Sequence, residues 1–406
     1  MDRSIVLILA LSLLIWTSPY IAKALRMPTP PVEIVAGSIL AYFGILGNDE
    51  FFDMIAEMGF LYLMFLAGME VNLKEITGSE KGTLRQAMLF VGSLWILSVT
   101  SGTLLGYSPI VIVSLPLISI GLLASLSRIY DKKTPWLQLS VTVGVIGEIT
   151  SIVALTVLDA ASTVGFGLKL WIKLGYLSLF IAGIYILYRL LKLLFWWFPE
   201  IKSELMPKLD TSDQDIRLSM SLFFILITLM LVLHLELALG SFIAGVAISA
   251  FFHHKKSLED KMSSLGFGFL IPLFFIHVGV SFDLESLAIP GIFTGALLIT
   301  ALSISIRLIS AFHLRKIADY QSALTTAFAL SMPLTLLIAV ATIGYTSGNI
   351  DIMIYYQMIL ASLFEVIVSM VAIKTIEGIS HKKAIERYRK QKEESPAGGS
   401  SHSPVS

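Results

Sequence analysis

Residues 114–123 read SLPLISIGLL, an apolar stretch with a proline, a serine and a glycine close to its middle. The stretch lies inside a hydrophobic segment, 108–130, that is long enough to cross about 30 Å of hydrocarbon as a helix. Proline removes a backbone amide donor, and a membrane tolerates this only where the freed carbonyls face protein, water or an ion. We therefore interpret Pro116, Ser119 and Gly121 as the markers of a broken transmembrane helix.

A second apolar segment, 320–344, carries a similar interruption. Its middle reads FALSMPLTLL at 328–337, with Ser331 and Pro333 at the break. An isolated proline kink would be a weak signal. Two broken helices at corresponding places in a chain are a pointer to a binding site near the bilayer midplane of a transporter.

Apolar segments of membrane-crossing length recur along the whole chain of 406 residues, of which 56% are hydrophobic and 14% charged. Such a composition is typical of a protein whose solvent is lipid. We count thirteen segments: 4–22, 31–47, 54–72, 86–106, 108–130, 137–159, 168–195, 216–235, 237–252, 264–281, 288–312, 320–344 and 352–376. We expect an all-α polytopic membrane protein whose first segment is a retained helix rather than a cleaved signal peptide.

Composition also argues against several classes of function. Lys plus Arg and Asp plus Glu both total 29, so the basic excess of a nucleic-acid-binding protein is missing. The chain has no cysteine, which excludes disulfides, thiolate metal sites and a cysteine nucleophile. We find no phosphate-binding glycine loop, zinc-protease motif or nucleophile elbow, and we interpret His253 and His254 as solvated loop residues. We expect a protein that is not an enzyme and needs no cofactor.

The positive-inside rule orients the chain, because Lys and Arg in short loops resist translocation. Most of the 29 basic residues fall in alternate connections, and the opposite connections keep only Arg3, Lys169 and Lys173. This bias predicts a multi-pass protein of the cell inner membrane, with the N-terminus outside and the C-terminus in the cytoplasm.

The longest polar stretch between segments, 199–215, follows the seventh segment and suggests a division into two inverted six-helix halves. We place these halves at about 1–160 and 216–379, with a linking helix at about 168–195, so that 1–379 forms the transporter domain. After Ile379 a basic helical stretch leads into SPAGGSSHSPVS, whose composition cannot bury a core. The tail 380–406 should therefore be cytoplasmic and partly disordered.

Few ionisable residues lie inside the spans, and each is costly enough there to suggest a functional site. Glu148 is the sharpest case. It lies midway along the sixth segment in TVGVIGEITS, with Gly144 and Ser151 on its helical face. Small neighbours leave room for an ion or water beside the carboxylate, although they also permit close helix packing around a protonated, purely structural Glu.

Three further ionisable residues are candidates for supporting roles. Arg307 lies deep in its span and must be paired or hydrated unless it snorkels to the interface, and Glu148 and Glu365 are its candidate partners. Glu365 itself is either a structural ion-pair partner or a second titrating group. His277 could titrate near neutral pH, or it could be a hydrogen-bonded packing residue.

Three longer phrases resemble one family of membrane proteins. They are EMGFLYLMFLAGMEVNL from Glu57, ALGSFIAGVAISAF at 238–251 and FGFLIPLFFIHVGVSFDL at 267–284. Together they are similar to the third, ninth and tenth spans of the monovalent cation/proton antiporters, especially the bacterial sodium/proton antiporters and potassium/proton exchangers. The resemblance runs over roughly 5–376.

This resemblance assigns roles to the candidate residues. It implies that Glu148 binds the monovalent cation, that Ser119 is the hydroxyl residue of the first broken helix, and that Arg307 is the supporting basic residue. Ser151 is a further ion-binding candidate because it lies on the helical face of Glu148. The family usually has Asp at the position of Glu148 and Asp, Asn or Gln at that of Gly147. The stretch 331–333, which is often Arg-Gly-Glu or similar in the family, reads Ser-Met-Pro here.

The resemblance further implies an antiporter that exchanges Na⁺ or K⁺ for protons by alternating access, embedded in the lipid bilayer as a homodimer. One carboxylate holds either one proton or one cation, so we expect one-for-one, electroneutral exchange. Sodium, potassium and lithium are not ranked by one sequence. The alternatives are a cation channel, a relative that does not transport, and an organic-anion transporter in which Arg307 would bind the substrate carboxylate.

Overall fold

The computed structural model describes residues 3–25, 27–47, 49–70, 81–123, 126, 130–131, 134–164, 168–198, 200, 213–233, 237–252, 256–282 and 284–394. Within these ranges the chain is helical and contains no strand, which confirms the all-α prediction. Each of the thirteen expected segments contains helix in its described part. Eight described helices are long and apolar enough to cross a membrane alone, and a bent pair adds a ninth span.

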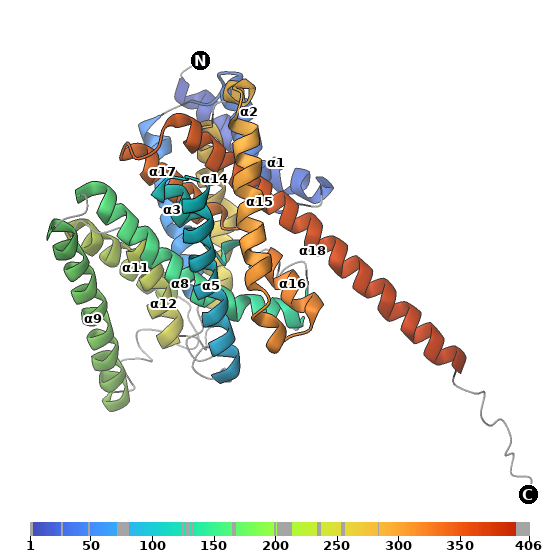
Figure 1. The fold of residues 1–406 in the computed structure, drawn as a ribbon. Coiled ribbons are helices and arrows are strands. Elements are labelled where there is room, and N and C mark those ends of the chain that lie inside the picture. Colours follow the sequence, from blue (N-terminus) through green and yellow to red (C-terminus); the bar gives the residue numbers. More distant parts are fainter. Residues whose placement is uncertain are drawn as a thin grey trace, which may run out of the picture.

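The helices follow the expected segments closely (Figure 1). Those before the polar stretch are α1 (Arg3–Leu25), α2 (Thr29–Tyr42), α3 (Glu50–Glu70), α5 (Lys81–Leu104), α6 (Pro109–Ser114), α8 (Pro135–Val164) and α9 (Leu168–Trp197). Those after it are α11 (Gln214–Leu233), α12 (Leu237–Phe252), α13 (Lys256–Leu265), α14 (Ile271–Val280), α15 (Ile292–Ser310), α16 (Tyr320–Ala329), α17 (Leu334–Thr346) and α18 (Ile352–Glu394). Short π and 3₁₀ turns, η1 (Gly266–Leu270), η2 (Leu284–Ala288) and η3 (Leu314–Lys316), complete the described elements.

The C-terminal helix is the longest described element. α18 continues past Ile379 to Glu394, and Figure 1 shows it projecting far beyond the bundle. The helical part of the expected tail is therefore present, whereas SPAGGSSHSPVS lies outside the described residues. His253, His254 and most of the polar stretch 199–215 also lie outside them.

Most of the close helix packing falls into two groups. In the first group α2 and α3 pack against α14, α3 packs against α12, and α11 packs against α12. In the second group α15, α16 and α17 pack against α18, and α5, α16 and α17 pack against α8. Each group takes helices from both sides of α9 in the sequence. The two broken helices both belong to the second group, because α6 packs against α5 and α17.

Glycines set the close approach of helices in the first group. A Cβ added to Gly68 of α3 would collide with the backbone of Phe242 in α12, and one added to Gly245 of α12 would collide with the backbone of Phe65 in α3. Gly279 of α14 makes the same kind of backbone approach to α2. Membrane helices rely on such small residues because lipid offers no hydrophobic force to hold them together.

We predict that Gly245→Ala lowers the stability of the purified protein by about 1–3 kcal/mol, because the added methyl group would force α3 and α12 apart. Gly92→Ala in α5 is the matched control, since a Cβ at Gly92 meets open space. Thermal unfolding in detergent measures both variants. Equal melting temperatures for the two would contradict the close packing of α3 on α12.

Candidate ion-binding site

The two predicted helix breaks lie at the expected residues. α6 ends at Ser114, and helix resumes only at Gly121, so that the backbone between them is free of helical hydrogen bonding over several residues. In the second break α16 ends at Ala329, α17 begins at Leu334, and the two axes are bent by 41°. Both breaks therefore contain backbone carbonyl and amide groups that make no helical hydrogen bonds.

Glu148 projects from the middle of α8 at the first break. Its side chain is fully buried, and one carboxylate oxygen, Oε2, accepts a hydrogen bond from the amide of Ile120. The other oxygen, Oε1, is buried without a hydrogen-bond partner among the described residues. Ser151, one turn further along α8, accepts a hydrogen bond from the amide of Ile118 at 2.9 Å. Side chains of α8 thus accept hydrogen bonds from the backbone amides that the first break leaves free. These bonds hold α8 against the break.

The small residue before Glu148 has a steric explanation. A Cβ added to Gly147 would collide with the side chain of Ile118, which packs directly against α8. Gly144, one turn earlier, similarly faces Ile120 and Leu123. Glycine at position 147 therefore permits α8 to approach the break, and a second carboxylate there would require the break to move.

Hydroxyl groups from both breaks meet at Ser119, whose side chain also interacts with the Glu148 carboxylate. Ser119 of the first break lies 3.4 Å from the hydroxyl of Thr335, which follows Pro333 at the start of α17. The amide of Gly121 also lies 3.4 Å from the Ser119 hydroxyl. Ser119 and Thr335 line a cavity of about 10 Å³ together with Pro30 and Phe275 of the first packing group. This is about the space that one water molecule needs.

Arg307 joins the two breaks from the opposite side. The guanidinium is fully buried rather than snorkelling. Its Nη2 donates to the carbonyl of Leu117 in the first break, and its Nε donates to the carbonyl of Leu330 in the second at 3.1 Å. Its Nη1 donates to the carbonyl and to the hydroxyl of Ser303, one turn earlier in α15. The guanidinium of Arg307 thereby donates hydrogen bonds to carbonyls that both broken helices leave free.

Glu365 of α18 lies on the Arg307 side of this arrangement. It is buried and is attracted electrostatically to Arg307, and it hydrogen-bonds the side chain of Ser303. Its Oε2 is buried without a described hydrogen-bond partner. Ser331, in the second break, donates to the carbonyl of Ala327 in α16 at 2.7 Å. Neither residue makes a described hydrogen bond to Glu148.

His277 lies outside this cluster. Its Nε2 is 2.8 Å from a carboxylate oxygen of Asp53 in α3, and both side chains are partly exposed, at 26% and 52%. The histidine is therefore one member of a polar pair between α14 and α3.

Sequence reasoning missed three polar residues that the structure makes conspicuous. Thr335 and Ser303 contact the site residues directly, and their only sequence signal is a hydroxyl near a break or near Arg307. Glu33 of α2 is buried and accepts a hydrogen bond from Ser18 of α1 at 3.1 Å. An acidic residue inside the second expected span was the available signal for Glu33.

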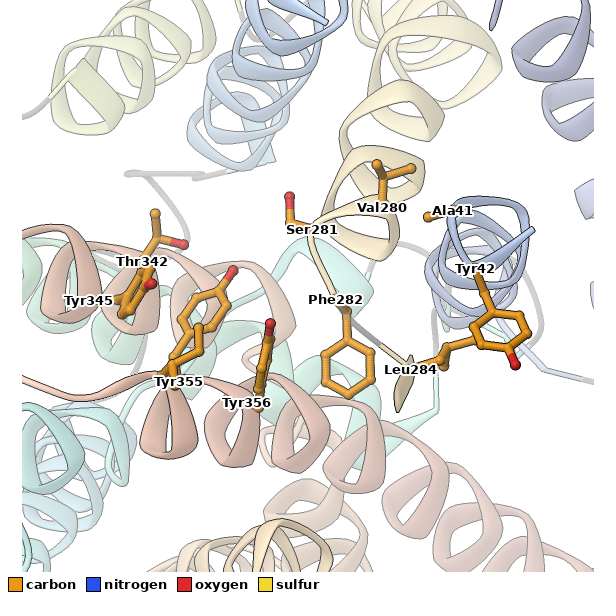
Figure 2. A pocket seen from close by; sticks show the side chains of 11 residues that line it. Ala41, Tyr42, Val280, Ser281, Phe282, Leu284, Thr342, Tyr345, Tyr355 and Tyr356 are labelled. Atoms are coloured by element: carbon orange, nitrogen blue, oxygen red, sulfur yellow. The ribbon is translucent and has the colours of Figure 1, made fainter. Parts of the chain in front are cut away.

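A larger cavity lies beyond the second break, at the far end of α17 (Figure 2). It measures about 440 Å³ and is lined by Thr342, Tyr345, Tyr355 and Tyr356 on one side and by Ser281 and Phe282 on the other. We call it the tyrosine cavity. Thr342 follows Thr335 by seven residues, so both threonines lie on the same face of α17. The cavity separates α17 and α18 of the second packing group from α2 and α14 of the first.

Known proteins with similar sequences are antiporters by name. The chain is 28% identical over 381 residues to the putative Na⁺/H⁺ antiporter YjbQ of Bacillus subtilis, an alignment that covers 84% of this chain and 58% of the relative. It is 27% identical over 388 residues to the probable Na⁺/H⁺ antiporter 3 of Methanocaldococcus jannaschii, covering 89% and 94%. The chain thus spans little more than half the length of the Bacillus relative and almost all of the archaeal one.

The fold is shared with a solved structure. The sodium proton antiporter MjNhaP1 from Methanocaldococcus jannaschii at pH 8 superposes with a TM-score of 0.66 at 17% identity, over 92% of this chain and the whole of that one. The sequence profile described as sodium/hydrogen exchanger, transmembrane, matches residues 8–377. Because this match takes in nearly all of the helical region, the chain belongs to the transmembrane sodium/hydrogen exchanger family.

Proposed function

We propose that this protein exchanges Na⁺ for protons across a membrane at the Glu148 carboxylate. One observation carries the proposal: a fully buried carboxylate faces a helix break, and one of its oxygens has no hydrogen-bond partner in the part of the chain that the structure describes. A buried carboxylate must either bind a proton or be neutralised by a cation, because an isolated charge is costly in a low-dielectric surrounding. The two occupants therefore compete for one place.

The groups around Glu148 suit a monovalent cation. The hydroxyls of Ser119 and Thr335 and the free carbonyls of the breaks are hard oxygen donors, and unwound carbonyls in broken helices serve this purpose in other transporters. Ser151 holds the first break against α8 through the amide of Ile118, so its role is to fix the geometry rather than to touch the ion. Arg307 offsets the partial negative charge of the carbonyls at the two breaks. Glu148 is thereby left to bind the cation or the proton.

The packing supports movement of one helix group against the other. The site residues Glu148, Ser119 and Thr335 all belong to the second group, whereas Pro30 and Phe275 close the small cavity from the first. Sliding of the groups would open this contact. The tyrosine cavity lies along the same seam, and the shared face of Thr335 and Thr342 offers the cation an access route to it.

Several finer assignments follow from the same proposal. A single competing carboxylate gives one-for-one, electroneutral exchange, with K⁺ as the alternative cation. We further propose a homodimer in a cell inner membrane, with the N-terminus outside and the tail in the cytoplasm. An organic-anion transporter is disfavoured because every guanidinium nitrogen of Arg307 already donates to Ser303, Leu117 or Leu330.

Reconstitution in liposomes with a pH-sensitive dye tests the function directly. We expect addition of Na⁺ to dissipate an imposed proton gradient without generating a membrane potential. Testing Na⁺, K⁺ and Li⁺ in turn ranks the cations. A large conductance that follows the membrane potential would identify a channel, and a folded protein with no cation-dependent proton flux would identify a relative that does not transport.

The role of Thr335 gives a sharper test of the binding geometry. We predict that Thr335→Val, which keeps the shape and removes the hydroxyl, raises the KM for Na⁺ by about tenfold, because one oxygen donor is lost. The maximal rate should change much less. Thr346→Val on the same helix is the control, since its hydroxyl bonds only to carbonyls of α17. An unchanged KM in Thr335→Val would remove Thr335 from the cation site.

A further inference from the structure

A third cavity lies far from Glu148, at the end of α15 that carries the basic turn η3. It measures about 520 Å³ and opens between α15 and α16. Its wall includes Leu308, Ile309 and Phe312 on the α15 side, Tyr320 and Leu324 on the α16 side, and Arg315 at η3. We call it the Arg315 groove. It shares no residue with the candidate site or with the tyrosine cavity.

The groove faces outward from the helix bundle. The side chains of Ile309, Phe312 and Tyr320 are 61%, 62% and 63% exposed, so the apolar wall is open to whatever surrounds the protein. α15 crosses the membrane as an apolar helix, and the surroundings of its exposed side chains are therefore lipid. An apolar concavity of this size is large enough for part of a lipid chain, whereas a flat helix surface would offer no such seat.

Charge distinguishes one end of the groove from ordinary lipid-facing surface. The guanidinium of Arg315 lies 5.3 Å from the centre of the Tyr320 ring, which holds it at the rim of the groove. Lys316 adds a second positive charge beside it. Asp319 is the nearby acidic residue, and its carboxylate caps α16 by accepting the amides of Gln321 and Ser322 at 3.1 and 3.2 Å. Hydrogen bonds from the side chain and amide of Ser322 and from the amide of Gln321 lower the pKa of Asp319. The carboxylate therefore stays negatively charged, and its charge stabilises the start of α16.

We propose that the Arg315 groove binds an anionic phospholipid, with an acyl chain along its apolar wall and the headgroup phosphate on Arg315. An arginine beside a tyrosine at a membrane interface, above an apolar groove between helices, complements both parts of such a lipid. A zwitterionic lipid would bring a positive charge next to Arg315 and Lys316. The bound chain would hold α15 against α16, the two helices that position Arg307 and the carbonyl of Leu330.

Thermal unfolding of the purified full chain in detergent tests this proposal. The probes are phosphatidylglycerol, phosphatidylcholine with the same acyl chains, and inorganic phosphate. We expect phosphatidylglycerol to raise the melting temperature more than phosphatidylcholine, and phosphate to have no effect. In Arg315→Gln, the phosphatidylglycerol concentration for half of the effect should rise about fivefold, the loss expected for one basic residue at a membrane surface.

Lys316→Gln is the matched control, because it removes the same charge from the same exposed turn without touching the groove wall. Its response to phosphatidylglycerol should stay near that of the unmodified protein. Equal losses in the two variants would overturn the proposal in favour of general attraction to the basic turn. Equal stabilisation by the two lipids would overturn it as well, and stabilisation by phosphate would assign the arginine to free anions instead of lipid.

Discussion

Glu148→Gln should reduce Na⁺-dependent proton exchange in liposomes to the level of protein-free vesicles, while the protein stays folded. Glutamine keeps the volume of the side chain and can still accept the amide of Ile120. It can neither release a proton nor neutralise a cation, so both halves of the cycle are lost. A pH-sensitive dye measures the exchange, and thermal unfolding in detergent verifies that the variant is folded.

The same competition predicts how exchange depends on pH. Raising the pH removes protons from the shared carboxylate, so the apparent affinity for Na⁺ should rise with pH by mass action until it levels off. Glu148→Asp should retain part of the activity because it keeps a carboxylate that is shorter by one methylene group. Exchange at the normal rate by the Gln variant would remove Glu148 from the centre of the mechanism.

The fold was predictable because its main signals are local in sequence. Length and hydropathy define a membrane-crossing helix without reference to its neighbours. A proline in the middle of a span is also a local signal, and Pro116 and Pro333 mark both breaks correctly. Glu148 stood out because a carboxylate is rare and costly in such a segment.

Partners of the site residues were less predictable because they depend on which helices touch. The sequence of α15 indicates that Arg307 must be satisfied, and acidic side chains were the evident candidates. The structure places Glu365 near the guanidinium, but the hydrogen bonds of Arg307 to the two breaks go to the carbonyls of Leu117 and Leu330, which carry no signal in the residue type. Gly147 is a similar case, since its contact with Ile118 appears only when α8 meets the first break.

His277 is a residue for which the sequence left two hypotheses open. A histidine within an apolar phrase is either a group that titrates near neutral pH or a hydrogen-bonded packing residue. The residue lies near the end of α14 and pairs with Asp53, which is itself half exposed. This pairing depends on how α14 meets α3, which the residue types alone do not reveal.

Arg307→Ala should be among the most destabilising single substitutions in the second helix group. It would leave the buried carbonyls of Leu117 and Leu330 without their donor, and each unsatisfied buried polar group costs about 1–3 kcal/mol. It would also leave Glu365 without its nearby positive charge. We therefore expect a loss of about 3–5 kcal/mol, the range seen when a buried charge loses its partner. Thermal unfolding in detergent measures this loss, and Arg315→Gln in the exposed turn η3 that follows α15 is the charge-matched control.

Arg307→Lys separates charge from geometry at this position. Lysine keeps the positive charge, but its single ammonium cannot reproduce the planar fork with which Arg307 spans two breaks and Ser303 at once. We expect it to recover part of the lost stability through its attraction to Glu365 and to leave Na⁺ exchange slow, because the two breaks would no longer be held in register beside Glu148. Full recovery of exchange by lysine would show that charge alone matters here. An unchanged melting temperature in Arg307→Ala would show that the carbonyls of the two breaks do not depend on the guanidinium, and the role of Arg307 in joining them would have to be abandoned.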